Sequence, residues 1–387
     1  MPIFQFQEEN LGEKIWSQLE RLKDRKGFLK AGFPRFDRLF GRDSLISAWQ
    51  LLNFNPEIAK ATLEILSQYQ GKVIDKEREE EPGKIIHETD FKAKRHPLSF
   101  FPFPYYGSVD STPLFLILFS FYFKKTRDEK FLNLHWENIL RALNWIKEYG
   151  DKDQDLFLEY QKLSSNGLFH QGWKDGFDDH LKIEPPVAIV EVQGYQYLAL
   201  KEIAKIAQEK KAVFLADQLK ERAEKLKEKF NYFFWMEDLK YFALALNAKK
   251  EQRKCITSNP GHLLFFEIVD KNKIELVVKR LFADDLWTEF GIRTHSKNEP
   301  DFDPKSYHLG SIWPHDNWII AQGLKKLGFQ KEYQKIKKAI FKAYRKLKNL
   351  PEYYTLIDGK ITEKLPKPPC YLQAWSLAAL FNFLQDF

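Results

Sequence analysis

The chain has 387 residues and a mass of 46.0 kDa, and because 44% of its residues are hydrophobic and 16% aromatic, we expect a large core and exclude a disordered protein. The formal net charge of +7 comes from basic residues interleaved with acidic ones, which argues against a nucleic-acid partner. No apolar run reaches the roughly 18 residues of a membrane span, and no signal peptide is recognisable, so we expect neither a membrane location nor secretion.

Cysteine usage and composition suggest a compartment and a working temperature. The two cysteines, Cys255 and Cys370, give no disulfide framework and fit a reducing cytoplasm, where we expect the protein. Abundant Lys and Glu together with two Met is a compositional bias of proteins from hot environments.

Most of the chain shows the hydrophobic period of an α-helix, with apolar residues three and four positions apart. In chain order, the segments with this period are Leu11–Lys26, Asp43–Gln68, Thr112–Phe123, Phe131–Tyr149, Val187–Ile206, Ala212–Tyr232, Asn272–Phe282, Asp316–Leu327, Glu332–Leu350 and Gln373–Leu384. The Asn259-Pro260 pair predicts a turn that leads into a helix, and Tyr241–Leu246 is a short run with strand alternation. No linker or repeat divides the sequence, so we predict one all-α domain over residues 1–387.

The segment Gln171–Tyr195 is the most distinctive stretch of the chain. It places Asp175 two residues after Trp173, and glycoside hydrolysis uses both residue types. A carboxylic acid whose pKa is raised by its neighbours can protonate a glycosidic oxygen, while an indole stacks on the C–H face of a sugar. The alternative is that Trp173 belongs to the core and the acids form a solvated loop.

A second acidic stretch, Asp151-x-Asp153-x-Asp155, has the opening spacing of a calcium-binding loop. Its sixth position is Leu156 and its twelfth is Lys162, where an EF-hand needs Gly and Glu. We therefore interpret it as a polar turn. No zinc, P-loop or dinucleotide motif is present in the sequence.

Six stretches resemble, in order, the motifs of the bacterial and archaeal amylo-alpha-1,6-glucosidase, or glycogen-debranching, glycosidase family. They are GFPRFDRLFGRDSLISAWQLL, EPGKIIHE with YYGSVDSTPLFLIL, QGWKDG with PPVAIVEVQGY, TSNPGHLL, FGIRT with SYHLGSIWPHDN, and LPEYY with CYLQAWSLAAL. The resemblance implies an (α/α)6 toroid, the six-hairpin glycosidase fold, with the active site in a funnel at one end. The helical segments above agree with this implication.

The resemblance also implies roles for individual residues. Asp175 corresponds to the general acid and Glu352 to the general base, with Glu191 as a rival base. The implied substrate-binding residues are Phe36, Arg42, Asp43, Tyr106, Asp110, Trp173, Lys174, Glu191, Gln193, Tyr307, His308, Trp313 and His315.

Each of these roles has a structural alternative. Arg42 and Asp43 can form an ion pair at a helix N-terminus, and Asp110 can cap the helix that follows it. Lys174 beside Asp175 would lower the pKa of the acid and oppose its role. Glu352 can be an ordinary surface glutamate after a proline.

Three functions follow from these observations. The main hypothesis is an inverting, exo-acting α-glucosidase of the amylo-alpha-1,6-glucosidase type, which needs no metal or organic cofactor. The second is a hydrolase of a small glycoside such as trehalose, glucosylglycerate or mannosylglycerate, favoured by the short chain and its positive charge. The third is a toroid that binds saccharides or a protein partner without catalysis.

Three residues, Gly176, Phe265 and Leu309, depart from the residues that are common in the family. These departures argue against debranching of a polymer more than they argue against sugar hydrolysis.

Overall fold

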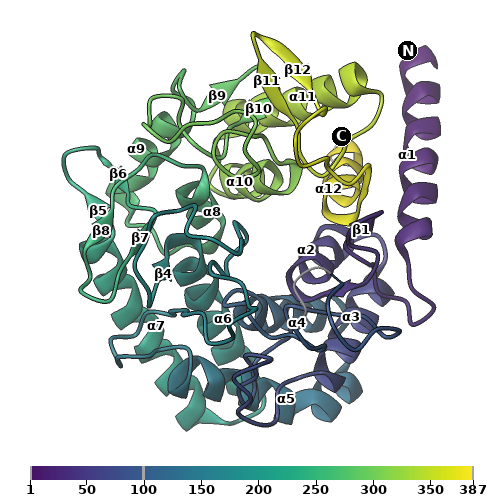
Figure 1. The fold of residues 1–387 in the computed structure, drawn as a ribbon. Coiled ribbons are helices and arrows are strands. Elements are labelled where there is room, and N and C mark those ends of the chain that lie inside the picture. Colours follow the sequence, from purple (N-terminus) through teal and green to yellow (C-terminus); the bar gives the residue numbers. More distant parts are fainter. Residues whose placement is uncertain (1, 98–100, 386–387) are drawn as a thin grey trace.

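The computed structural model describes residues 2–97 and 101–385, and Figure 1 shows that their helices are arranged in one ring. The two ends of the chain meet on the same side, where α1 lies beside α12. The helices are α1 (Pro2–Leu22), α2 (Gly41–Leu51), α3 (Pro56–Gln68), α4 (Ser111–Thr126), α5 (Glu129–Glu148), α6 (Val190–Glu209), α7 (Val213–Phe233), α8 (Asn259–Phe266), α9 (Lys271–Leu281), α10 (Pro314–Lys326), α11 (Gln330–Leu347) and α12 (Ala374–Gln385).

The helices form two concentric layers. The even-numbered helices pack side by side in a closed inner ring, in the order α2, α4, α6, α8, α10, α12 and back to α2. The odd-numbered helices lie outside, where α3, α5, α7, α9 and α11 each pack on the helix that precedes them in the chain and α1 packs on α12. This is the (α/α)6 toroid, and the predicted fold class is confirmed.

The sequence explains which helices lie inside. The inner helix α4 is apolar on every side and is buried continuously from Ser111 to Ser120. The outer helix α11 carries Lys at many positions and buries a single stripe that includes Tyr333, Ile336 and Ile340. A helix that is apolar all round must be enclosed by others, whereas an amphipathic helix can face water on one side.

The connections differ at the two ends of the ring. Those from an inner helix to the next outer helix are short, at 52–55, 127–128, 210–212, 267–270 and 327–329. Those from an outer helix to the next inner helix are long, at 23–40, 69–110, 149–189, 234–258, 282–313 and 348–373. All the long loops therefore gather at the end where the inner helices begin, and function is expected there.

The long loops contain short strands rather than a central sheet. These are β1 (Gly32–Phe33), β2 (Leu39–Phe40), β3 (Glu88–Thr89), β4 (Ala188–Ile189), β5 (Trp235–Met236), β6 (Tyr241–Phe242), β7 (Ala245–Leu246), β8 (Gln252–Arg253), β9 (Trp287–Thr288), β10 (Gly291–Ile292), β11 (Thr355–Ile357), β12 (Lys360–Thr362) and β13 (Leu372–Gln373). The antiparallel pair β1 and β13, with Gly32 opposite Gln373, joins the first long loop to the last. The other pairs are β2 with β3, β5 with β6, β9 with β10 and β11 with β12, while β7 lies between β4 and β8.

Three predicted elements were wrong in detail. The segment Asp43–Gln68, expected as one helix, forms two helices, because Pro56 lacks the N–H that a continuing helix needs. The Asn55 side chain accepts the backbone N–H of Glu57 at 3.2 Å and caps the second of them, α3. The strand expected over Tyr241–Leu246 is split between β6 and β7, which belong to different sheets. The first helix ends at Leu22 instead of Lys26.

One further element agrees more closely. The helix expected after the Asn-Pro turn is α8, which begins at Asn259 itself. None of the described helices combines the length and apolar character needed to cross a membrane.

Candidate active site

A pocket opens at the end of the ring where the inner helices begin, and both predicted proton-transfer residues, Asp175 and Glu352, line it. Asp175 comes from the loop 149–189 and Glu352 from the loop 348–373. The pocket encloses about 670 Å³, its open mouth included. Its described lining residues are Phe36, Phe40, Arg42, Asp43, His87, Glu88, His96, Leu168, Trp173, Asp175, Gly176, Phe177, Tyr307, Trp313, Glu352, Lys367 and Trp375.

Arg42, in the first turn of α2, is buried and holds Asp175 in place. Its Nη1 lies 2.9 Å from Oδ2 of Asp175, its Nε donates to Oδ2 of Asp110 at 2.6 Å, and its Nη2 donates to the Gly172 carbonyl at 2.8 Å. Arg42 therefore fixes both the side chain of Asp175 and the backbone that precedes it. Asp110 also accepts from Ser108 Oγ at 2.7 Å and makes no capping hydrogen bond, so its side chain supports Arg42 rather than the helix end.

Glu352 is buried, which excludes an ordinary surface glutamate. Its Oε2 pairs with Nη2 of Arg35 at 2.8 Å and accepts the backbone N–H of Cys370 at 2.8 Å. Its Oε1 accepts the hydroxyl of Tyr307. Three donors from three different loops thus hold this carboxylate in one orientation.

Asp43 follows Arg42 in α2, and its carboxyl accepts a hydrogen bond from Gln373 Nε2 at 3.0 Å. Burial raises the pKa of Asp43 to about 8, and the negative charges of Asp175 and Glu352 add to this rise, while Arg42 opposes it. Asp43 is therefore protonated at neutral pH and can donate a hydrogen bond into the pocket.

A second acid of the pocket, Glu88, is paired with Arg38. Burial raises the pKa of Glu88 to about 7, against the lowering effect of Arg38. His87 lies with its Nε2 4.0 Å from Oδ2 of Asp175. Burial and the charges of Arg42 and Arg38 lower the pKa of His87, so the imidazole is neutral.

Aromatic rings form the wall between Asp175 and Glu352. Trp173 meets Trp313 edge to face at 5.8 Å between ring centroids, and Trp313 meets Tyr307 in the same way at 4.8 Å. Behind the pocket-lining Trp375, His315 stacks on the indole at 3.7 Å. His308 likewise stacks on Trp313 at 5.3 Å. Trp375 is buried and also contributes to the pocket lining.

Several predicted site residues lie one layer behind the pocket. Lys174 is buried and its Nζ donates to the Thr294 carbonyl at 2.6 Å, with its pKa lowered to about 8 by burial. The Gln193 amide is bonded to the backbone of Leu158 and Ile189. The Tyr106 hydroxyl donates to the Tyr69 carbonyl at 2.8 Å.

Glu191, the rival base, also lies behind the pocket lining. Its Oε2 accepts from Asn259 Nδ2 at 3.0 Å, and burial raises its pKa. A Cβ at Gly172 would lie 3.5 Å from its Oε1, so the backbone before Trp173 lies against Glu191. Glu352, and not Glu191, is the glutamate among these two that lines the pocket with Asp175.

Some pocket residues escaped our sequence reasoning. Phe40, His87 and Glu88 lie inside stretches that we quoted as motifs, so the signal was present but we singled out other positions. Lys367 belongs to the PKPPC stretch, which matches no motif that we recognised. Arg35, the partner of Glu352, sits in the first motif beside Phe36.

Two groups of described residues have the spacing of metal ligands, and protein cations already contact both. In the first, Lys250 Nζ lies 2.8 Å from carboxylate oxygens of both Asp153 and Asp155, and Arg222 pairs with Asp151 at 2.9 Å. Two cations of the chain thus offset part of the negative charge of this turn.

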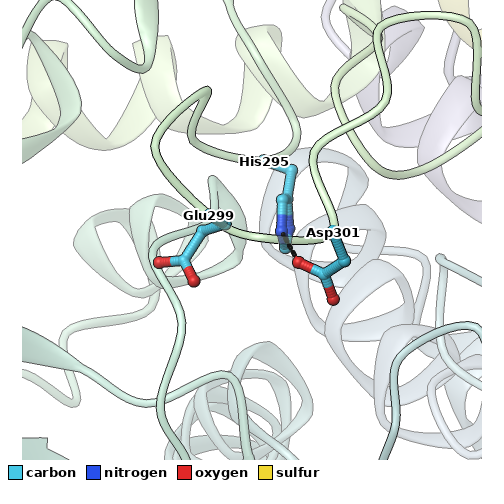
Figure 2. A group of neighbouring side chains, drawn as sticks. All are labelled: His295, Glu299 and Asp301. Atoms are coloured by element: carbon cyan, nitrogen blue, oxygen red, sulfur yellow. Dashed lines mark hydrogen bonds and ion pairs between the residues drawn. The ribbon is translucent and has the colours of Figure 1, made fainter.

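Figure 2 shows the second group, in which His295 forms a hydrogen bond to Asp301 at 2.8 Å. The carboxylate of Glu299 points away from both of these side chains. Glu299 accepts the backbone N–H of Ile256 at 2.7 Å, and Asp301 pairs with Arg253 at 2.9 Å. The hydrogen bonds and Arg253 account for these charges, and we assign this group to holding the loop 282–313 in place.

Comparison with solved structures identifies similar folds at low sequence identity. The crystal structure of GH63 mannosylglycerate hydrolase from Thermus thermophilus in complex with Tris and D-glycerate matches with a TM-score of 0.74 and 14% identity, over 97% of this chain and 100% of that one. The same enzyme in complex with glucose matches with a TM-score of 0.73 and 15% identity, over 97% and 100% of the two chains. At such identity the likeness establishes the fold alone.

A search of curated protein sequences finds no match to this chain. Residues 39–364, however, match the sequence model of a glycoside hydrolase family, described as the mannosylglycerate hydrolase MGH1-like glycoside hydrolase domain. The expected six-hairpin glycosidase is therefore confirmed at the level of fold and enzyme class, whereas the narrower resemblance to the amylo-alpha-1,6-glucosidase family finds no support in these matches. Since the match covers most of the sequence, the chain belongs to the MGH1-like family of glycoside hydrolases.

Proposed function

We propose that the protein is an inverting hydrolase of a small α-glycoside with an anionic aglycone, either mannosylglycerate or glucosylglycerate. The observation that carries the proposal is that Asp175 and Glu352, from loops far apart in sequence, line one pocket. Family membership supports the same choice.

In the proposed reaction Asp175 gives its proton to the glycosidic oxygen, and the aglycone leaves as an alcohol. Glu352 takes a proton from a water molecule, whose oxygen bonds to the anomeric carbon from the opposite face. One water is consumed, and the sugar is released with inverted configuration. Inverting enzymes place the two carboxyl groups roughly 6.5–9.5 Å apart to leave room for this water.

The other pocket residues have roles in binding the sugar. Protonated Asp43 donates to a sugar hydroxyl, and the Arg42 guanidinium keeps the Asp175 side chain oriented. The face of Trp173 covers the C–H surface of the ring. Trp313 and Tyr307 extend this apolar wall towards Glu352.

The test is sugar release from mannosylglycerate, glucosylglycerate, trehalose, maltose, isomaltose, panose and branched dextrin. Asp175→Asn and Glu352→Gln should each lower kcat at least roughly 100-fold on the preferred substrate, because each removes a proton-transfer group. Asp178→Asn is the matched control, since Asp178 is in the same loop with its side chain 86% exposed, and it should behave as wild type. Proton NMR of the first product should record the inverted anomer.

Other results would assign a different function. A preference for branched dextrin or panose would restore the amylo-alpha-1,6-glucosidase hypothesis, which six sequence motifs favour. A preference for trehalose would keep a small glycoside but reject the anionic aglycone. Binding without release, unchanged in Asp175→Asn, would favour a non-catalytic saccharide-binding toroid.

A further inference from the structure

The loop that carries Asp175 closes on itself directly after this residue. The backbone N–H of His170 donates to the Gly176 carbonyl at 3.1 Å, and the N–H of Gly176 donates to the His170 carbonyl at 3.3 Å. Residues 171–175 therefore form a short closed turn, which we call the acid turn, and Asp175 is its last residue. Arg42 holds the carboxylate of Asp175, so the position of the turn itself depends on what holds the two closing residues.

His170 is fully buried and holds the first end of the acid turn. Its Nε2 lies 2.9 Å from Oδ1 of Asp179, and its Nδ1 lies 2.7 Å from the hydroxyl oxygen of Tyr160. Because a carboxylate accepts hydrogen bonds, we place the imidazole proton on Nε2, and Nδ1 then accepts from Tyr160. Burial and the neighbouring His180 lower the pKa of His170, so the ring is neutral. The ring thus ties the acid turn to chain segments on both sides of it.

His180 confines the second end of the acid turn, at Gly176. A Cβ added at Gly176 would lie 2.7 Å from Cε1 of the His180 ring, closer than two carbon atoms pack. This steric need for a small residue accounts for the departure at position 176. The His180 ring meets His170 edge to face at 5.0 Å and stacks on His308 at 5.4 Å, while His308 stacks in turn on Trp313 of the pocket wall. The backbone of Gly176 therefore lies directly against an imidazole that two other imidazoles hold in place.

We propose that His170 and His180 are positioning residues for the general acid, because they fix the two ends of the acid turn and thereby the reach of Asp175 towards the glycosidic oxygen. This inference rests on the proposed function, in which Asp175 donates a proton. Neither histidine is among the described residues that line the pocket, so both act through the turn and not on the sugar. Proton donation needs heavy atoms within about 2.6–3.2 Å of each other, so a shift of the turn by about 1 Å weakens this step and leaves the sugar pocket intact.

The first experiment uses the leaving group to separate proton donation from the rest of catalysis. The glycerate glycoside that wild type prefers needs a proton on its leaving oxygen, whereas the α-fluoride of the same sugar releases fluoride ion with little assistance. His170→Phe keeps a ring but loses both hydrogen bonds, so kcat should fall roughly 10- to 100-fold on the glycoside and by no more than about threefold on the fluoride. Asp175→Asn should show the same selectivity. His135→Phe, at a buried histidine of α5 whose ring packs on Phe131 at 4.4 Å, is the control and should change neither rate.

A double-mutant cycle tests His180 separately. Gly176→Ala should lower kcat on the glycoside by roughly tenfold or more, because the added methyl group pushes against the His180 ring and shifts the acid turn. His180→Ala makes room for this methyl group, so in that background Gly176→Ala should cost at most about twofold. His180→Ala alone should also lower the rate on the glycoside more than the rate on the fluoride, since the turn loses the ring that confines it.

Equal losses on glycoside and fluoride in His170→Phe would overturn the inference, because a merely structural role lowers both rates together. An equal cost of Gly176→Ala with and without His180 would overturn it as well. If His170→Phe does not fold, Asp179→Ala takes its place, since it removes one of the same hydrogen bonds at a side chain that is 41% exposed.

If wild type hydrolyses neither compound, the proposed function fails, and amide hydrogen exchange then decides about the acid turn alone. Exchange of the His170 and Gly176 N–H groups that rises at least roughly tenfold in Asp179→Ala, while exchange in α5 stays as in wild type, supports the positioning role. Unchanged exchange at these two groups, or an equal rise in α5, rejects it.

Discussion

Arg42 gives the most direct test of how the site is held together. Arg42→Met removes the guanidinium but keeps much of the side-chain volume. Asp110 is then left buried with a hydroxyl of Ser108 as its remaining side-chain partner. Removing one partner of a buried ion pair costs about 3–5 kcal/mol, because the other charge stays buried and unpaired.

A second substitution separates the cost of the unpaired Asp110 charge from the cost of the lost side-chain volume. In the double variant Arg42→Met/Asp110→Asn no unpaired charge remains, and the Asn side chain can still accept from Ser108. We expect it to recover about 1–3 kcal/mol relative to Arg42→Met. Activity should not recover, because Asp175 loses the 2.9 Å contact that orients it in all variants that lack Arg42.

Thermal unfolding and sugar release are the two assays. For a chain of 387 residues Arg42→Met should lower Tm by about 4–6 °C. The reasoning is refuted if Arg42→Met unfolds at the wild-type temperature, or if the double variant is no more stable than the single one. Recovery of activity together with stability would also refute it, since Arg42 would then have no separate role at Asp175.

Three further predictions follow from single groups. The pKa of Asp43 is about 8 in the folded state, against an ordinary value of 3.8, so between these pH values the folded protein holds a proton that the unfolded chain releases. The free energy of unfolding should therefore fall as pH rises from about 4 to about 8, by at most about 1.4 kcal/mol per pH unit. Asp43→Asn should flatten the slope of Tm against pH. Lys250→Met leaves Asp153, Asp155 and Glu159 without their shared cation, so Tm should fall and millimolar Ca²⁺ should restore it in the variant but not raise it in wild type. Lys174→Met should lower kcat roughly 10- to 100-fold with KM nearly unchanged, because Lys174 anchors the loop of Asp175, whereas a rise in KM alone would indicate direct substrate contact.

Local patterns predicted the helices better than their ends. The helices expected over Phe131–Tyr149 and Ala212–Tyr232 agree with α5 and α7 within two residues, because outer helices alternate buried and exposed faces. The break before α3 was missed because apolar residues continue the period through Leu52 and Phe54. The signal was nevertheless present in Asn55-Pro56, a capping residue followed by a proline at the first helical position.

The site was predicted through resemblance more than through pattern. Asp175 and Glu352 lie in motifs, and the structure brings both into one pocket. The side-chain directions could not be read from the sequence, because Glu191 and Lys174 are themselves motif residues and yet point behind the pocket lining. Lys367 could not be found at all, since its place in the pocket depends on the fold of a long loop with no periodic pattern.

The architecture explains why so many acids tolerate burial at one end of the molecule. Glu191 and Asp316 occupy the first turns of the inner helices α6 and α10, and Asp110 is the residue before α4. Asp43, in the first turn of α2, is the exception, because burial raises its pKa to about 8 and keeps it protonated. The unpaired N–H groups and the positive dipole end of each helix stabilise a nearby carboxylate by about 0.3–1 kcal/mol, and up to about 2 kcal/mol where it is partly buried. If the inner helices ran in the opposite direction, they would present carbonyl oxygens to the same pocket and disfavour these acids. The long loops can therefore place Asp175 and Glu352 over a ring of helix N-termini that already favours negative charge, and Arg42 and Arg35 supply the remaining compensation.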